Sequence, residues 1–214
     1  MKLNVPSYQQ KPWSADCGLL CIQMLLEYYG NKINLDELRE EIDIDATGIC
    51  VWEIGSFLLK KGFKVTLITR DPKLFSKKDF ENPPKDFWEF FQNEKNFDLK
   101  TDDDFESFSY LKKFIETWWK IDIKVPDVND IEKALLNDSL IISILTYKFL
   151  VHDTAKFDFH YNLVTGINQS EIMVNDPGST YWGELKYPIN DFLYAVYATT
   201  YKWVGRGSFL LISK

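Results

Sequence analysis

The segment from Cys17 to Gly30 constrains the fold more than any other part of the chain. Drawn as a helix, it is apolar around most of its circumference, at Leu19, Leu20, Ile22, Met24, Leu25, Leu26, Tyr28 and Tyr29. A helix with this pattern is buried on nearly all sides, so it belongs at the centre of a core. Asp16 lies where an N-cap is expected, and Gly30 predicts the end of the helix.

The rest of the N-terminal part predicts an extended lead-in, two more helices and a strand. Residues 4–16 show no helical period. A second helix is expected after Asn34, which has the pattern of a capping box. A third is predicted from about Val51 to Lys61, and the alternation of apolar and polar residues over 63–67 predicts a strand.

The stretch from Asp71 to Trp118 differs in composition from the rest of the chain. It contains 12 acidic, 8 basic and 12 aromatic side chains in 48 residues. Amphipathic patterns over 87–91 and 105–119 predict helices there. We expect a single domain over residues 1–214, with residues 71–118 as a mostly helical insertion that offers a surface to a protein partner.

The second half of the chain predicts mainly strands. The continuous apolar run 140–145 has the length of a central strand that is buried on both faces. Further strands are predicted at 161–167, 172–174 and 208–212, with a hairpin turn at 168–170 and helices at 130–136 and 189–196. Helices first and strands later are typical of an α+β fold, with an N-terminal helical lobe packed on a C-terminal antiparallel sheet.

The composition limits what the chain can bind and where it works. Its net charge of −7 is opposite in sign to that of a sequence-independent nucleic-acid binder, so we expect no nucleic-acid partner. No apolar run approaches the about 18 residues that a membrane span needs. Residues 1–8 contain no apolar signal core. We therefore expect a protein of the cytoplasm, or one exported without a cleavable signal peptide.

Cys17 is the candidate nucleophile among three cysteines, a number that does not favour a disulfide framework. It begins the apolar helix, where unpaired N–H groups and the helix dipole stabilise a thiolate. Gly18 follows it, and we expect this glycine to leave room for a substrate backbone. Cys21 and Cys50 are expected to be small buried apolar residues.

His160 is the candidate general base. It lies at the start of a predicted strand, whereas His152 falls in a polar stretch and is expected to be a loop residue. Asp176 follows across one hairpin, so its carboxylate can reach the far imidazole nitrogen and fix the tautomer. A neutral imidazole beside Cys17 would take the proton of the thiol and so activate the nucleophile.

A side-chain amide shortly before the cysteine can stabilise the oxyanion that forms during acyl transfer. Gln9 and Gln10 both meet this requirement, together with the backbone N–H of Cys17. We prefer Gln10 because it is nearer to the cysteine, and the choice between the two stays open.

A family resemblance rests on four stretches, Val5 to Gln10, Asp16 to Gly30, His160 to Ile167 and Val174 to Gly178, with Thr47-Gly48 before the third helix. Together they resemble the bacteriocin-processing, double-glycine leader peptidases and their stand-alone relatives, which are papain-fold cysteine peptidases. The resemblance covers about residues 4–69 and 125–180. The opening Asp-Cys-Gly-Leu-x-Cys also resembles the plant and animal guanylyl cyclase domain proteins.

The peptidase resemblance implies a papain-like fold with a buried central helix and a role for each candidate residue. By this resemblance Cys17 is the nucleophile, His160 the general base and acid, Asp176 the orienting carboxylate and Gln10 the oxyanion donor. It also implies a peptide or protein substrate. Because no transporter domain follows in the sequence, we expect a stand-alone member.

The leading hypothesis is therefore a thiol enzyme that acts on an amide bond, most simply a cysteine peptidase. Acyl transfer or side-chain deamidation would use the same groups. The alternatives are a catalytically retired binding module on the same scaffold and a guanylyl-cyclase-like protein. No cofactor or metal is expected, because the sequence has neither a glycine-rich phosphate loop nor metal-ligand spacing, and Asp102-Asp103-Asp104 is interpreted as a helix cap.

Overall fold

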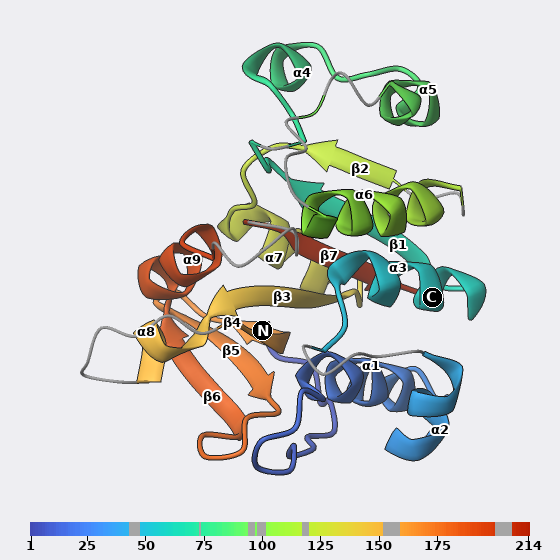
Figure 1. The fold of residues 1–214 in the computed structure, drawn as a ribbon. Coiled ribbons are helices and arrows are strands. Elements are labelled where there is room, and N and C mark those ends of the chain that lie inside the picture. Colours follow the sequence, from blue (N-terminus) through green and yellow to red (C-terminus); the bar gives the residue numbers. More distant parts are fainter. Residues whose placement is uncertain are drawn as a thin grey trace.

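The computed structural model describes residues 1–42, 48–72, 74–93, 97, 102–116, 120–151, 159–199 and 207–214. The helices are α1 (Cys17–Tyr28), α2 (Leu35–Glu41), α3 (Val51–Lys60), α4 (Lys77–Glu81), α5 (Phe87–Gln92), α6 (Asp102–Ile115), α7 (Val128–Leu136), α8 (Tyr147–Val151) and α9 (Ile189–Tyr197). The strands are β1 (Lys64–Thr69), β2 (Lys120–Ile123), β3 (Leu140–Thr146), β4 (Phe159–Ile167), β5 (Glu171–Asp176), β6 (Gly183–Pro188) and β7 (Phe209–Ser213). Figure 1 shows their arrangement.

One sheet organises the described part of the chain, with seven strands in the order β2-β1-β7-β3-β4-β5-β6. All neighbouring pairs are antiparallel except β1 and β2, which run parallel. The predicted central strand is confirmed, because β3 has three strands on either side. The N-terminal half also contributes to the sheet, through β1, and β2 was not predicted from the sequence.

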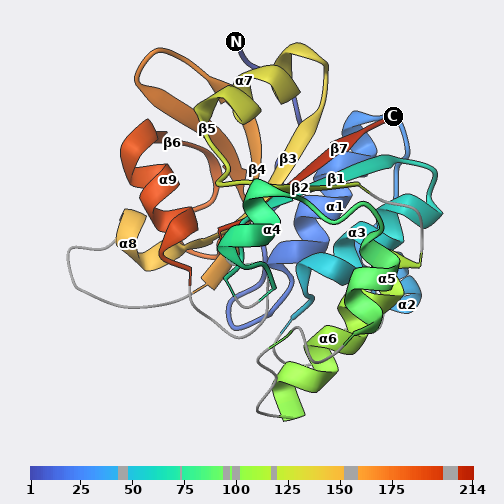
Figure 2. The ribbon, with the colours of Figure 1, turned by 90° about the horizontal axis from the view of Figure 1, so that it is seen from above.

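Helices cover both faces of this sheet (Figures 1 and 2). On one face α1 lies against β4 and α3 lies against β1 and β7; on the other, α7 and α9 lie against β3, β4, β5 and β6. In β3, Ile142 and Ile144 belong to the first core and Ile141 and Leu145 to the second. This two-sided burial explains why the strand is apolar without alternation.

Helix α1 is buried along most of its length, as its sequence predicts. Its first ten residues, Cys17 to Leu26, are all buried. The helix packs on β4 of the sheet and on the neighbouring helices α2 and α3, so few of its side chains reach solvent. Among the described residues, no helix combines the length and the apolarity that crossing a membrane requires.

The compositionally distinct stretch 71–118 contains α4, α5 and α6. The expected helices at 87–91 and 105–119 correspond to α5 and α6, although α6 begins earlier, at Asp102. The side chain of Phe114 in α6 packs on Gly55 and Trp52 of α3. This lobe therefore rests on the N-terminal helices; that it is an insertion within one domain stays a prediction.

The N-terminal lead-in contains no helix, as predicted, but turns at residues 11–14, and it lies across β4 and β5, the strands that carry the site. The Leu3 N–H donates to the Thr165 carbonyl at 2.7 Å. The side-chain amide of Asn175 donates to the carbonyls of Val5 and Pro6, both at 2.9 Å. These bonds hold the lead-in beside the end of β5.

Candidate active site

The thiol of Cys17 lies at the N-terminus of α1, as predicted. Its side chain is buried with 9% of the residue exposed. Asp16 occupies the N-cap position, but its carboxylate makes no hydrogen bond to the helix and instead accepts from Arg39 Nη2 at 2.7 Å and Nε at 3.3 Å. The first N–H groups of α1 are thus not capped by this carboxylate, and they can stabilise negative charge at the helix start.

His160 and Asp176 form a buried pair. The imidazole Nε2 and Asp176 Oδ1 are 2.8 Å apart, with 5% and 0% of the two residues exposed. Strands β4 and β5 form a hairpin that returns the chain beside its start, which brings these residues together across a separation of 16 positions. The Gly178 N–H donates to the same carboxylate oxygen at 2.7 Å.

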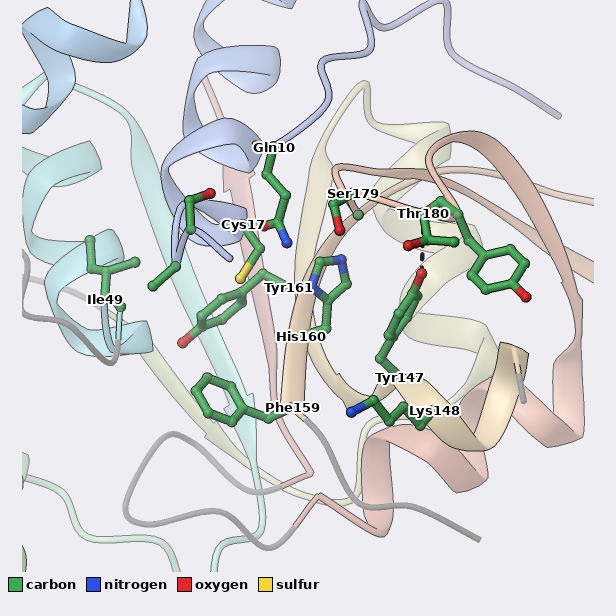
Figure 3. A pocket seen from close by; sticks show the side chains of 15 residues that line it. Gln10, Cys17, Ile49, Tyr147, Lys148, Phe159, His160, Tyr161, Ser179 and Thr180 are labelled. Carbon is green, nitrogen blue, oxygen red and sulfur yellow. Dashed lines mark hydrogen bonds between the residues drawn. The ribbon is translucent and has the colours of Figure 1, made fainter. Parts of the chain in front are cut away.

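Figure 3 shows the imidazole of His160 beside the thiol of Cys17, and the carboxylate of Asp176 binds the Nε2 of the same ring. With Nε2 directed to the carboxylate, the other ring nitrogen, Nδ1, faces Cys17. The contact between α1 and β4 produces this approach, because the first turn of the helix lies over the first residues of the strand. The structure thus brings together the three residues that the sequence singled out.

The electrostatic environment favours a protonated imidazole. Burial by itself lowers the pKa of His160, because a low dielectric disfavours the charged form. The negative charge and hydrogen bond of Asp176, with a further contribution from Cys17, outweigh that effect and raise the pKa of His160 to about 10. An imidazolium beside the sulfur is the partner that a thiolate needs.

The structure separates the two candidate glutamines. Gln10 lines the cavity above Cys17, and its side-chain amide extends toward the thiol and His160 (Figure 3). Its backbone N–H donates to the Pro177 carbonyl at 2.7 Å, which fixes it beside the Asp176 turn. The exposed Gln9 is directed elsewhere, and its amide donates to the Ser179 carbonyl at 2.8 Å. Gln10 is therefore the glutamine that lies within reach of the cysteine.

A cavity of about 380 Å³ opens over these side chains. Figure 3 shows that Ile49, Phe159 and Tyr161 lie on the Cys17 side, whereas Tyr147, Ser179 and Thr180 lie beyond His160. The residues that line it are Gln10, Ser14, Ala15, Cys17, Gly48, Ile49, Tyr147, Lys148, Phe159, His160, Tyr161, Gly178, Ser179, Thr180 and Tyr181.

Gly18 has a different reason for being a glycine from the one expected. A Cβ at this position would overlap the Cγ2 of Ile49 and lie 3.3 Å from the Cδ2 of Tyr161. The small residue therefore serves the packing of the cavity wall on α1. The expectation that it leaves room for a substrate backbone is wrong, because side chains of the protein fill that space.

The other two cysteines lie apart from the reactive arrangement. Cys21 is fully buried, and burial raises the pKa of its thiol. Cys50, the N-cap residue of α3, is half-buried rather than buried as expected, although desolvation of its thiol still raises its pKa. Both environments favour the protonated, unreactive thiol.

Some of the residues singled out in the sequence lie outside the part of the chain that the structure describes. His152 and Thr47 lie there, as do the side chains of Asp102-Asp103-Asp104. Within the part of the chain that the structure does describe, no group of three or more His, Cys, Asp or Glu side chains could hold a metal ion.

Sequence reasoning did not identify Tyr147, Lys148 or the residues 179–181 as cavity residues. Tyr147 comes directly after β3, whose Leu145 is paired with His160. Pairing the predicted central strand with the histidine strand would have brought this tyrosine to the site, but register cannot be read from an unbroken apolar run.

The chain resembles known proteins in both sequence and fold. The model of the Peptidase C39 family matches residues 6–88. The Lactococcin-G-processing and transport ATP-binding protein LagD of Lactococcus lactis subsp. lactis is 33% identical over 76 residues, which are 36% of this chain and 10% of that protein. The chain therefore spans about a tenth of the length of this relative.

Two solved structures are similar over the whole chain. A C39-like peptidase from Bacillus anthracis superposes with a TM-score of 0.56 at 14% identity, covering 100% of this chain and 98% of that one. A double glycine motif protease from an AMS/PCAT transporter, in complex with its leader peptide, gives a TM-score of 0.50 at 13% identity and covers 100% and 94%. None of these matches supports the resemblance to guanylyl cyclase domain proteins. The chain has the α+β fold of papain-like C39 peptidases.

Proposed function

We propose that this protein is a papain-like cysteine peptidase in which Cys17 is the nucleophile, His160 the general base and acid, and Asp176 the orienting carboxylate. One observation carries the proposal: a buried imidazole lies between the thiol at a helix N-terminus and a carboxylate 2.8 Å from its far nitrogen. Gln10 and the backbone N–H of Cys17 are the proposed oxyanion donors.

The reaction follows from the positions of these groups. The Cys17 thiolate attacks the carbonyl carbon of the scissile amide, and the oxygen takes the charge and accepts hydrogen bonds from the two donors. The imidazolium of His160 then gives its proton to the leaving nitrogen, the C–N bond breaks, and a thioester remains. The neutral imidazole removes a proton from a water molecule, which attacks the thioester; the C–S bond breaks, the carboxylic acid is released, and the thiolate–imidazolium pair is restored.

The same chemistry assigns the two sides of the cavity. Because His160 must give its proton to the leaving amine, the leaving fragment lies on the side of Tyr147 and Ser179. The acyl fragment lies on the opposite side of Cys17, beside Ile49 and Tyr161. We propose a peptide as the substrate, and the similar double glycine motif protease bound to a leader peptide supports this choice.

An electrophilic thiol probe tests the nucleophile. The unmodified protein should be labelled at Cys17, and Cys17→Ala should abolish both labelling and peptide cleavage. Cys50→Ala is the matched control and should be labelled like the unmodified protein. His160→Gln should slow labelling by about 100-fold or more, since the positioned base is lost. Equal labelling of the unmodified protein and Cys17→Ala would overturn the proposal.

A peptide-library screen then separates a peptidase from a binding module. Cleavage that disappears in Cys17→Ala supports the peptidase. Binding of peptides without cleavage, with a thiol that is alkylated like a free cysteine, would instead show a retired site.

The glutamine pair offers an internal comparison for the oxyanion donor. Gln10→Ala should lower kcat by about 100- to 1,000-fold, the usual effect of removing one such donor. Gln9→Ala should leave kcat within about twofold, because its amide is directed to the Ser179 carbonyl. Kinetics with a peptide found in the screen measure both, and the reverse order of effects would assign the role to Gln9.

A further inference from the structure

Tyr147 contacts the buried pair of the site, although it belongs to neither strand that carries that pair. It is the first residue of α8 and follows directly after β3. In the sheet, Thr146 is paired with Phe159 and Leu145 with His160, so the chain enters α8 at the level of the histidine. This register places the tyrosine side chain over the imidazole.

The ring of Tyr147 covers one face of His160. The two ring centroids are 4.6 Å apart, and the planes are inclined by 43°. Asp176 lies at the far edge of the same imidazole, and its Oδ2 is buried with no hydrogen-bond partner among the residues that the structure describes. A charge pair is stronger where water is excluded, and its strength falls as water gains access. The tyrosine ring is part of the wall that excludes water here.

The hydroxyl group of Tyr147 makes a second contact, with the loop that follows Asp176. It donates to the Tyr181 carbonyl at 3.2 Å (dashed line in Figure 3). Gly178 lies beneath it, and a Cβ at this position would be 3.0 Å from that hydroxyl and 2.9 Å from Asp176 Oδ1. The tyrosine therefore packs on the same loop whose Gly178 N–H holds the carboxylate.

We propose that Tyr147 is a positioning residue for the reaction: its ring shields the His160–Asp176 pair from water, and its hydroxyl fixes the loop of residues 177–181 that forms the leaving-fragment side of the cavity. This inference rests on the proposed function for its effect on turnover. The shielding of the pair is a property of the folded protein and can be measured without a substrate.

Several titratable groups surround the pair and must be considered with it. They are Cys17 and Cys21 from α1, Asp176 from β5, Tyr187 from β6, and Tyr147 and Lys148 from α8. Burial has the largest single effect and lowers the pKa of His160, whereas Asp176 supplies the largest of the effects that raise it. Water admitted by a change at Tyr147 weakens both the burial effect and the larger combined effect of Asp176 and Cys17, so the net rise in the pKa of His160 should shrink.

An NMR titration of the His160 imidazole tests the shielding. The chain has only two histidines, so His160→Gln assigns the resonances. Tyr147→Ala should lower the pKa of His160 by about one pH unit or more, since the pair becomes accessible to water. Tyr147→Phe keeps the ring and should leave the pKa of His160 within about 0.3 pH unit of its value in the unmodified protein. Phe149→Ala removes another ring of α8, one that contacts Tyr194, and should also leave the pKa of His160 unchanged.

The hydroxyl contact has its own measurement. Tyr147→Phe should raise KM for a peptide substrate several-fold with little change in kcat, because only the cavity loop loses its tether. Where Tyr147→Ala does not fold, as judged by thermal unfolding, Tyr147→Leu replaces it. The inference is overturned if the Ala or Leu variant titrates like the unmodified protein, or if Phe149→Ala shifts His160 equally. A clear shift without any peptide cleavage would support the shielding and count against the peptidase.

Discussion

At the scale of single residues, small changes next to Cys17 decide whether the site can form. Gly18 is the clearest example, since its lack of a side chain allows Ile49 and Tyr161 to pack on the first turn of α1. The sequence motif singled out this glycine, but the reason expected for it, room for a substrate backbone, is wrong. The sequence does not show which neighbour will occupy the space beside a glycine.

Gly18→Ala should destabilise the protein by about 1–3 kcal/mol, the usual cost of an overfilled core. It should also slow labelling of Cys17, because the added methyl group displaces the helix start or Ile49. Urea unfolding and thiol labelling measure the two effects. Ile49→Ala removes the group that clashes, so the double variant should be less destabilised than the two single effects added together. Strict additivity would argue against this contact.

His160 also makes stability depend on pH. Its pKa is about 10 in the folded protein, against about 6.5 in an unfolded chain. A raised pKa means that the pair contributes its full stability below about pH 6.5 and loses it as the pH rises toward 10. The difference in unfolding free energy between the unmodified protein and His160→Gln should therefore shrink over that range, as measured by urea unfolding from pH 6 to pH 9.5. A difference independent of pH would contradict the raised pKa.

At the scale of elements, the position of Cys17 depends on how α1 is held by its neighbours. Asp16, directly before the cysteine, is buried and takes two hydrogen bonds from Arg39 of α2. The capping box of Asn34 and Glu37 that starts α2 was visible in the sequence, and the structure confirms it. The ion pair was not visible, because it joins residues 23 positions apart.

Arg39→Ala should destabilise the protein by about 3 kcal/mol, because it leaves the buried Asp16 carboxylate without its charged partner. Arg39→Lys should recover part of that loss, since lysine restores the charge without the two-pronged guanidinium geometry. Asp36→Asn removes the exposed partner of the same arginine and should cost at most about 0.5 kcal/mol. Chemical unfolding compares the free energies of unfolding of the three variants. A larger loss for Asp36→Asn than for Arg39→Ala would show that the buried Asp16–Arg39 pair contributes less than we expect.

At the scale of the whole molecule, segments distant in sequence meet at the site on β4 and β5. The lead-in, α1, the β4–β5 hairpin and α8 each supply a part of the site, and the C-terminal strand β7 lies between β1 and β3. The lobe of α4, α5 and α6 is joined to this body mainly through α3 and α6. The contribution of the α3–α6 contact to the stability of the protein can therefore be tested directly.

Phe114→Ala should destabilise the protein by about 3–5 kcal/mol, because the ring is fully buried against Gly55 and Trp52 of α3. Phe105→Ala, on the exposed side of the same helix, should change stability by about 0.5 kcal/mol or less. Thermal or chemical unfolding gives both values. Similar values for the two variants would mean that the lobe packs on the body only loosely.

The sequence alone determined the elements with strong local signals and the chemistry that they carry. The clearest signals come from residues near one another in the sequence. They are the apolar period of α1, the capping box of α2, the unbroken apolar run of β3 and the 168–170 turn. Cys17, His160, Asp176 and Gln10 could be named because their residue types and the hairpin geometry limit what they can do. Their catalytic roles stay a prediction for the labelling experiments to decide.

Only the tertiary structure decided which distant groups meet. It separated Gln10 from Gln9, gave Gly18 its packing role, paired Asp16 with Arg39, and placed Tyr147 over His160. The short elements β2, β6 and α8 also became visible only there. The physical reason is the same in each case: strand register and helix packing are set by burial summed over the whole core, and no local stretch of sequence contains that sum.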